Sequence, residues 1–382
     1  MCSEWQTHTV GDFLTLEYGK PLDKKDRKVD GLYPAYGANG IKARSDKYLC
    51  ESKAIIIGRK GSAGELTITE DRFWPLDVTY FVKFDTAKYD LTFVYYLLSL
   101  LSLPDLATGV KPGINRNKVY AIKVKTPSLF EQQRIVAILD QAFADIEKAR
   151  ANAEKNLKNA RELFDSYLNQ VFSQRGEGWV ESELFDHVKF IDYRGKTPKK
   201  TQEGLRLITA KNVRMGYLKK TPEEFVARDS YDEWMTRGIP EKGDILFTTE
   251  APLANVAQLD TYEKVVFAQR IITMQPDRSV LDDAFLKYLL MSKPVQERIL
   301  KKGTGATVTG IKASLLKKII IEYPFQLSEQ RMIVNTLEVL DRKVNKLEVV
   351  FSEKLNSLDE LKKSLLQKAF SGDLTKTEGH AA

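Results

Sequence analysis

Two long stretches of the chain, residues 131–172 and 329–372, repeat apolar residues at alternating steps of four and three. This spacing places apolar side chains along one face of an α-helix, and its continuation over several heptads is typical of a coiled coil. In the first stretch the two seam positions hold Ile135, Ala142, Ala149 and Leu163, and Leu139, Ile146, Ala153, Ala160 and Tyr167. In the second they hold Ile333, Leu340, Leu347 and Leu361, and Leu337, Val344, Phe351, Leu358 and Leu365. We therefore predict two long helices that pack through coiled-coil seams.

The ends of both predicted helices carry recognisable signals. Ser128 and Glu131 form a capping box before the first helix, and Ser328 and Glu329 stand at the start of the second. Glycines suited to the helix stops follow at Gly176 and Gly372. Near these ends the apolar stripe is broad, and we expect it to pack against the chain's own domains. The residues of these broad ends are Phe164, Leu168, Phe172, Leu365, Leu366 and Phe370.

The chain also repeats itself. A shift of 198 residues places Glu131 on Glu329 and aligns the two helical stretches without a gap. Upstream the match is looser but keeps its order: FVYYLLSL from Phe93 resembles FLKYLLMS from Phe285, and AIIIGRKGSAGEL stands where GDILFTTEAPLANV stands in the second half. Each half therefore consists of a variable globular part followed by a well-matched helix.

The globular part of each half mixes strands and helices. Strand-like runs occupy residues 54–57 and 80–84 in the first half and 244–248, 264–273 and 317–323 in the second. A helix near Phe93 or Phe285 accompanies them. We interpret each part as a small α/β domain.

The domain between the two helices limits how they can run. A helix of residues 131–172 is about 63 Å long, whereas a compact domain of residues 173–328 has a radius of gyration of only about 15 Å. Such a domain joins the two helices only if their ends lie close together, so we expect an antiparallel pair with the first domain at the other end. The prediction is an α+β fold: two small α/β domains separated by two long antiparallel helices, with a pseudo-twofold internal repeat. The expected segments are domain 1–130, helix 131–172, domain 173–328, helix 329–372 and polar tail 373–382.

Composition narrows the class of partner and of chemistry. The chain has 59 Lys and Arg against 52 Asp and Glu, and its formal charge of +7 favours polyanionic partners. Two cysteines and three histidines, with no Cys-x-x-Cys motif, make neither a disulfide framework nor a metal-ligand cluster. The apolar stretch from Phe93 to Leu103 is too short to span a bilayer, and no signal-peptide pattern opens the chain. We therefore expect a cytoplasmic protein with no membrane contact and no cofactor.

Loops rich in Gly, Ser, Lys, Arg and Asn separate the strand-like runs, and recognition residues concentrate on such loops. Against DNA, lysines would contact phosphates, whereas Arg, Asn, Gln and Glu have the geometry for base edges. Taken singly, each of these residues is more often a solvated surface side chain, so the set marks regions. In the first domain the candidates are Lys20, Asn39, Arg59, Lys60, Ser62, Lys111, Asn115 and Arg116. In the second they are Arg194, Lys196, Lys199, Lys200, Lys211, Asn212, Arg214, Thr249, Glu250, Gln269, Arg270 and Lys312.

The residues that precede both helices resemble those of a known family. After Pro127 the chain reads LFEQQRI, and after Pro324 it reads SEQRMI from Ser328, while the second helix ends in AFSGDL from Ala369. The duplication of this motif, each time between a variable domain and a long helix, resembles the DNA specificity subunits of type I restriction-modification systems. The resemblance covers nearly the whole chain.

This resemblance implies two target recognition domains, each of which reads one half of a bipartite site in double-stranded DNA. It implies that the helix pair sets the length of an unread spacer between the half-sites. It also implies that modification subunits, which bind S-adenosylmethionine and methylate adenine, dock on the chain, and that restriction subunits join them to cleave. The chain itself would be a non-catalytic subunit.

Two other classes of function remain as alternatives. An adenine methyltransferase would carry Asp or Asn before Pro-Pro-Tyr or Pro-Pro-Phe, and the chain contains no Pro-Pro. A nuclease would need clustered carboxylates for metal ions, whereas Asp282-Asp283 and Glu223-Glu224 are isolated pairs that suit helix starts or solvated turns. A coiled-coil scaffold that binds only protein would show no salt-dependent affinity for duplex DNA.

Overall fold

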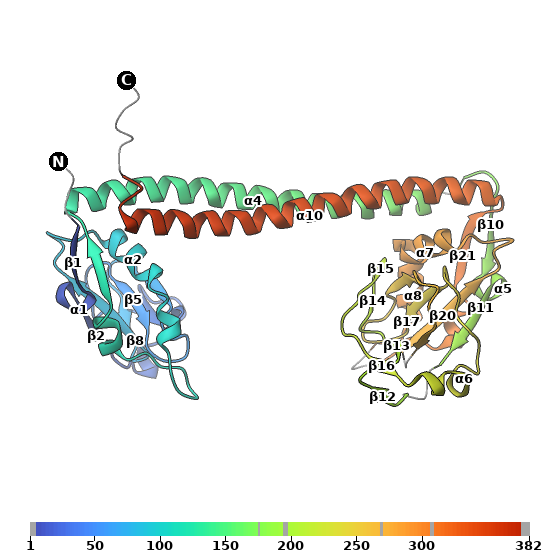
Figure 1. The fold of residues 1–382 in the computed structure, drawn as a ribbon, viewed down its shortest axis with the longest axis horizontal. Coiled ribbons are helices and arrows are strands. Elements are labelled where there is room, and N and C mark those ends of the chain that lie inside the picture. Colours follow the sequence, from blue (N-terminus) through green and yellow to red (C-terminus); the bar gives the residue numbers. More distant parts are fainter. Residues whose placement is uncertain (1–4, 175, 194–197, 268–269, 306–308, 376–382) are drawn as a thin grey trace, which may run out of the picture. The chain divides into compact units, whose positions relative to one another are not determined.

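The computed structural model describes residues 5–174, 176–193, 198–267, 270–305 and 309–375. These residues form two compact units, one within 1–154 and 353–382 and the other within 155–352. Each unit contains one globular domain and parts of both long helices (Figure 1). No helix among the described residues is long and apolar enough to cross a membrane.

The first domain is built on a four-stranded antiparallel sheet of order β2-β8-β5-β6. Its strands are β2 (Leu14–Tyr18), β8 (Thr79–Phe84), β5 (Ile55–Gly58) and β6 (Leu66–Ile68). The other strands are β1 (Gln6–Thr9) paired with β9 (Lys123–Thr126), and β4 (Gly40–Ser45), β3 (Tyr33–Gly37) and β7 (Trp74–Pro75) in a second sheet. The helices are α1 (Val10–Phe13), η1 (Lys24–Asp26), α2 (Leu91–Leu100), η2 (Leu103–Leu106) and α3 (Arg116–Tyr120).

The second domain has an equivalent four-stranded sheet of order β11-β20-β17-β18. Its strands are β11 (Val188–Asp192), β20 (Ile271–Pro276), β17 (Ile245–Thr248) and β18 (Val256–Gln258). The remaining strands are β10 (Trp179–Glu183), β12 (Lys200–Thr201), β13 (Leu205–Ile208), β14 (Val213–Arg214), β15 (Tyr217–Leu218), β16 (Phe225–Val226), β19 (Val265–Phe267) and β21 (Ile320–Pro324). The helices are α5 (Leu184–His187), η3 (Arg228–Ser230), α6 (Tyr231–Trp234), α7 (Asp283–Met291), α8 (Lys293–Lys301) and α9 (Ala313–Leu316).

The main sheets of the two domains share one topology, which confirms the predicted internal repeat. In each, a short antiparallel pair, β1 with β9 or β10 with β21, connects the main sheet to a long helix. A parallel pair, β3 with β7 or β13 with β19, accompanies the main sheet. The predicted strand-like run 264–273 is wrong as a single element, because it holds the end-to-end strands β19 and β20 of two different sheets.

The long helices are α4 (Leu129–Ser173) and α10 (Leu327–Ser371), each of 45 residues. In the first unit the Lys362 ammonium lies 3.0 Å from Glu147, and Arg150 pairs with Asp359. The partners move back along α10 as α4 advances, so the two helices run antiparallel, as predicted. In the second unit Arg161 pairs with Glu348 at 2.5 Å in the same antiparallel sense.

The seam prediction is confirmed at one of its two heptad positions and is wrong for three residues of the other. Leu139 and Ile146 of the predicted seam are buried in the first unit. Leu163, Leu347 and Leu361 were also predicted at the seam, but they are 57%, 43% and 46% exposed. Two helices bury only a narrow stripe on each other, so apolar residues at the edges of a broader stripe stay at the surface.

The broad apolar ends of the helices pack on the chain's own domains, as expected. Phe164, Leu168 and Phe172 of α4 are buried in the core of the second domain. Leu365, Leu366 and Phe370 of α10 are partly buried against the core of the first domain. Each globular domain therefore shares its hydrophobic core with a helix end.

The helix termini agree in part with the predicted signals. Helix α4 begins directly after Ser128, but α10 begins at Leu327, so Ser328 lies inside the helix and does not precede it. Gly372 follows the last residue of α10 with φ +82°, and the Lys368 carbonyl accepts a hydrogen bond from the Asp373 amide at 3.0 Å. A left-handed residue directly after a helix closes its last turn, which explains why glycine stands there.

Candidate nucleic-acid interface

In the first domain, two loops that carry predicted contact residues pair at one end of the main sheet. The Ile114 amide donates to the Arg59 carbonyl at 3.0 Å, and the Gly61 amide donates to the Pro112 carbonyl at 3.1 Å. Lys60 and Gly113 form a β-bridge between the same loops. The structure therefore brings the segments with Arg59, Lys60, Lys111 and Arg116 together, although they are some fifty residues apart in sequence.

Tyr18, the last residue of β2, lies at the centre of this group. The guanidinium carbons of Arg59 and Arg116 lie 5.3 and 5.1 Å from the centroid of its ring. The Tyr18 ring also contacts Tyr80, with 5.1 Å between centroids, and 48% of Tyr18 is exposed. Burial raises the pKa of Tyr80, while the two nearby guanidiniums act in the opposite direction.

Tyr18 was not among the predicted contact residues. Leu14 and Leu16 precede it at alternating positions and are buried, so the strand pattern predicts that Tyr18 points into the core as well. Its exposure at the end of the strand could not be read from this alternation.

The remaining candidates of the first domain surround the same strand end. Lys20 is exposed two residues after Tyr18, and Asn39 is exposed in the turn between β3 and β4. A Cβ on Gly58, the last residue of β5, would meet the Ser62 carbonyl at 2.0 Å and the Ala38 carbonyl at 2.8 Å. This close approach places the segments of Ser62 and Asn39 beside the loop that begins at Arg59.

Asn115 has a structural role in the folded chain. Its side-chain oxygen accepts a hydrogen bond from the Asn117 amide at 2.9 Å and so caps α3. The cap positions Arg116 as the first residue of that helix.

Five basic side chains of this group form no ion pair with any carboxylate among the described residues. They are Lys20, Arg59, Lys60, Lys111 and Arg116. Uncompensated positive charge at one end of a domain attracts polyanions through a long-range field. This end of the first domain is therefore a candidate surface for a nucleic-acid backbone.

The second domain pairs its equivalent loops in the same way. Glu250 and Gly310 form the β-bridge, and the Ile311 amide donates to the Thr249 carbonyl at 3.0 Å. The side chains differ: Thr249 is buried, and Glu250 forms an ion pair with Arg270 at 2.9 Å. The two domains therefore present different chemistry on one common framework.

The structure corrects the interpretation of Asn212 as a surface residue. Asn212 is fully buried, its Oδ1 accepts from the Thr209 amide at 3.0 Å, and its Nδ2 donates to the carbonyls of Lys219 and Pro222 at 3.1 and 3.0 Å. It holds the turn around β14 and β15 together and is not exposed to a partner.

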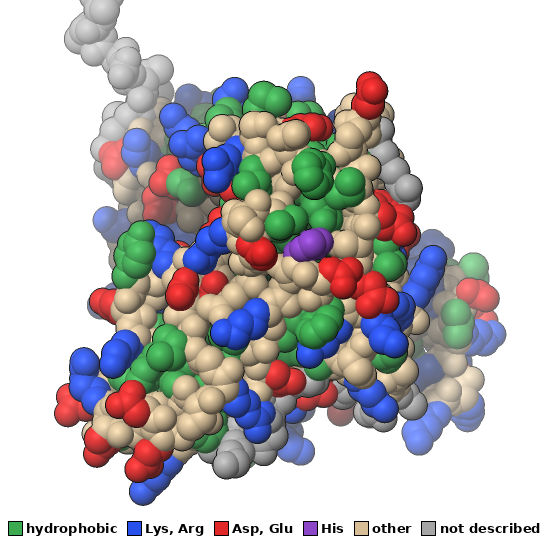
Figure 2. All heavy atoms as spheres, turned by 90° about the vertical axis from the view of Figure 1, so that its right-hand side faces the viewer, with side chains coloured by type: hydrophobic (Ala, Val, Ile, Leu, Met, Phe, Trp, Pro, Cys, Tyr) green, Lys and Arg blue, Asp and Glu red, His purple; other side chains and the backbone are tan. Residues whose placement is uncertain are grey.

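The other candidates of the second domain are spread over its surface. Lys200 pairs with Glu224 at 2.7 Å, and Arg214 is half-buried. Lys199, Lys211 and Lys312 are exposed. Arg194, Lys196 and Gln269 lie outside the described residues. Over the face of the second unit that Figure 2 shows, basic and acidic side chains are interspersed with apolar ones.

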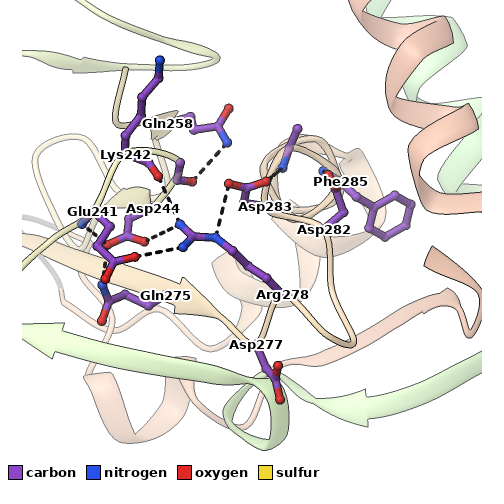
Figure 3. A network of polar contacts seen from close by, with 12 residues as sticks. Glu241, Lys242, Asp244, Gln258, Gln275, Asp277, Arg278, Asp282, Asp283 and Phe285 are labelled. Atoms are coloured by element: carbon purple, nitrogen blue, oxygen red, sulfur yellow. Dashed lines mark hydrogen bonds and ion pairs between the residues drawn. The ribbon is translucent and has the colours of Figure 1, made fainter. Parts of the chain in front are cut away.

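One arginine of the second domain forms ion pairs with a cluster of carboxylates. Arg278 donates to Glu241 at 2.9 Å and lies 3.4 Å from Asp244 and 3.7 Å from Asp283 (Figure 3). Asp244 is buried, and burial raises the pKa of its carboxyl group, opposed by hydrogen bonds from the Glu241 amide and Gln275. Among the described residues no group of His, Cys, Asp or Glu is arranged to hold a metal ion. The cluster therefore fastens the loop before β17 to the start of α7.

The predicted role of Asp282 is confirmed. Its side chain accepts a hydrogen bond from the Phe285 amide at 3.0 Å and caps α7. The Asp282-Asp283 pair thus serves a helix start and an ion pair to Arg278.

The chain contains two copies of one α/β domain. Each copy is fused to a long helix and carries paired surface loops at one end of its main sheet. This organisation defines a modular binding protein with two globular domains. A family model, the type I restriction modification DNA specificity domain, matches residues 2–155 and 176–356. The chain therefore belongs to the family of type I restriction-modification DNA specificity subunits, with two DNA-recognition domains.

Curated specificity subunits are similar to this chain, and solved structures share its fold. A putative type I restriction enzyme specificity subunit of Haemophilus influenzae is 24% identical over 347 residues, which cover 85% of this chain and 84% of the relative. The EcoDI specificity subunit of Escherichia coli is 22% identical and covers 97% of this chain and 89% of its own length. A chain from a study of complex assembly and conformational transition of the type I R-M system shares the fold with a TM-score of 0.77 at 17% identity, over 97% of this chain and 98% of its own length. The HsdS subunit of Thermoanaerobacter tengcongensis gives a TM-score of 0.59 at 17% identity, with 97% of both chains covered.

Proposed function

We propose that each recognition domain binds one half of a bipartite site in double-stranded DNA through the loops at the end of its main sheet. The observation that carries this proposal is the group of five basic side chains in the first domain that form no ion pair with any described carboxylate. Four of them, all except Lys20, lie in or next to the two loops whose pairing recurs in the second domain. Lys20, Lys60 and Lys111 would contact phosphates, and arginines would contact base edges.

The two half-sites would differ in sequence. Arg59 and Lys60 of the first domain stand where Thr249 and Glu250 stand in the second, at equivalent positions of the same β-bridge. A buried threonine and a paired glutamate cannot make the contacts of an arginine and a lysine. The specific target is therefore an asymmetric sequence.

The helix pair would set the length of the unread spacer between the half-sites. Ion pairs between α4 and α10 fix their antiparallel register within each unit, through Arg150 with Asp359 and Arg161 with Glu348. A fixed register makes the paired length of the helices a property of the sequence.

The helices would also carry the modification subunits, which restriction subunits then join. Leu347 and Val350 lie three residues apart on one face of α10 and are 43% and 47% exposed, close to Val349. Exposed apolar side chains on one face of a paired helix suit a partner helix. The chain would act in the cytoplasm as a non-catalytic recognition subunit, with methylation and cleavage supplied by its partners.

The test is a selection of randomised duplexes by the full chain in complex with its modification subunits. We expect a bipartite consensus with an unread centre, and an affinity whose logarithm falls with log salt by about 0.9 for each neutralised phosphate. Absence of salt-dependent duplex binding would favour a protein-binding scaffold. Metal-dependent cleavage of DNA by the purified chain would favour a nuclease.

A further inference from the structure

Arg116 is held in place without using its hydrogen-bond donors. Its guanidinium lies over the Tyr18 ring at 5.1 Å and forms no hydrogen bond or ion pair with any part of the chain that the structure describes. Its backbone is fixed on both sides, by the Asn115 cap and by the Ile114 amide that donates to the Arg59 carbonyl. Five N–H donors are thus presented on an anchored side chain.

Arg59 differs from Arg116 in this respect. Its Nε and Nη2 donate to the Asp77 carbonyl at 3.2 and 2.7 Å, so one edge of its guanidinium is committed to the protein. Arg59 adds positive charge over the Tyr18 ring. Of the two arginines, however, it is Arg116 that keeps all of its N–H donors available.

The contact between Arg116 and Tyr18 is not part of the structure that the two domains share. In the second domain Asp192 pairs with Ile272 where Tyr18 pairs with Tyr80. Ala313 follows Lys312, the residue directly before α9, where Arg116 follows Asn115. A contact required for folding would recur in the second copy, as the β-bridges between the loops do. Among the described residues of the second domain this contact is absent, so it is a feature that distinguishes the first domain.

The chemistry favours a base over a phosphate as the ligand of Arg116. Exposed lysines already stand on the neighbouring loops at positions 20, 60 and 111, and flexible ammonium groups suffice for phosphates. A planar fork packed on an aromatic ring loses little further freedom on binding and matches the O6 and N7 acceptors of guanine in the major groove. We propose that Arg116 reads a guanine in the half-site of the first domain and that Tyr18 is the residue that positions it.

This inference rests on the proposed function, because it specifies which contact makes the first domain selective. The test compares complexes of the full chain with its modification subunits, selected on duplexes randomised in both half-sites. The variants are Arg116→Lys, Arg116→Ala, Tyr18→Phe and Tyr18→Leu, with Lys118→Ala on the exposed side of α3 as the matched control.

Arg116→Lys keeps the positive charge but removes the planar set of guanidinium N–H donors. We expect it and Arg116→Ala to lower the preference for guanine at one position of the first half-site by about 5- to 150-fold. Tyr18→Leu should weaken the same preference, while Tyr18→Phe, which keeps the ring, and Lys118→Ala should leave it intact. The second half-site should be unchanged in every variant.

Two results would overturn the inference and leave the proposed function standing. In the first, Arg116→Lys behaves as the original chain and Arg116→Ala weakens binding to all sequences alike, which would make Arg116 a phosphate contact. In the second, every variant keeps the same guanine preference. A complex of the original chain without any sequence preference would instead refute the proposed function itself.

Discussion

Gln132 and Gln330, at the same position of the repeated motif, make the same three hydrogen bonds in the two halves of the chain. Gln132 Oε1 accepts from the Asp90 amide at 2.9 Å, and its Nε2 donates to the carbonyls of Pro127 and Lys88 at 2.9 and 3.1 Å. The side chain is fully buried. It therefore ties the start of α4 to the end of β9 and to the cap of α2.

Gln330 repeats this arrangement. Its Oε1 accepts from the Asp282 amide at 2.9 Å, and its Nε2 donates to the carbonyls of Pro324 and Val280 at 2.8 and 2.9 Å. The pair explains why glutamine occurs in both copies of the motif, since only a side chain with one acceptor and two donors satisfies three backbone groups here. Each recognition domain is thereby fixed to its own long helix.

Replacement of this glutamine should destabilise the first unit. Gln132→Ala leaves one buried amide and two carbonyls without partners, and we expect a loss of about 3 kcal/mol in the free energy of unfolding. Denaturant unfolding followed by tryptophan fluorescence and circular dichroism measures it. Gln133→Ala is the matched control, because Gln133 is the exposed neighbour. Equal effects of the two replacements would contradict the role assigned to Gln132.

Two tyrosines at equivalent positions of α2 and α7 should respond differently to loss of the hydroxyl group. Tyr96 donates to Asp140 at 2.5 Å, whereas the buried Tyr288 hydroxyl has no hydrogen-bond partner among the described residues. Tyr96→Phe should lower the free energy of unfolding by about 1 kcal/mol, because the bond to a charged group is lost at a partly exposed site. Tyr288→Phe should be neutral or stabilising. A larger loss from Tyr288→Phe than from Tyr96→Phe would show that the orphan hydroxyl has a partner.

The thiol of Cys50 should react slowly with disulfide reagents at neutral and mildly alkaline pH. It is half-buried, and burial raises the pKa of its thiol to about 11, since a low-polarity environment disfavours the thiolate. In a Cys2→Ser variant, modification by a disulfide reagent at pH 8 should be at least about 10-fold slower than in the unfolded chain, because the smaller thiolate fraction outweighs the higher nucleophilicity of a more basic thiolate. The rate should rise with pH up to about 11. A plateau below pH 9 would contradict the raised pKa.

Sequence was sufficient for the parts of the molecule that periodicity determines. The heptad pattern of Leu139 and Ile146 reports burial directly, because the same face of a helix meets its partner at every turn. The internal repeat then fixes the number of domains. The recognition loops are different, because their contacts join distant segments: Glu250 meets Arg270, and Arg116 meets Tyr18, through sheet pairings that no local pattern encodes. Asn212 looked like a surface loop residue for the same reason, since its partners are the carbonyls of a turn that closes over it.

The two long helices can be shortened without disturbing the register in which they pair. Residues 151–157 of α4 and 352–358 of α10 lie between the ion pairs of Arg150 with Asp359 and of Arg161 with Glu348. Deleting both segments removes one heptad from each helix and leaves both pairs able to form, with a shortening of about 10 Å. The preferred unread spacer should then shrink by about three base pairs, at 3.4 Å per pair, while both half-site sequences stay the same. Selection on duplexes with randomised half-sites and variable spacers measures this, and deletion of only one segment, which breaks the register, is the control. A changed half-site consensus at constant spacing would refute the proposal that the helices set the spacing.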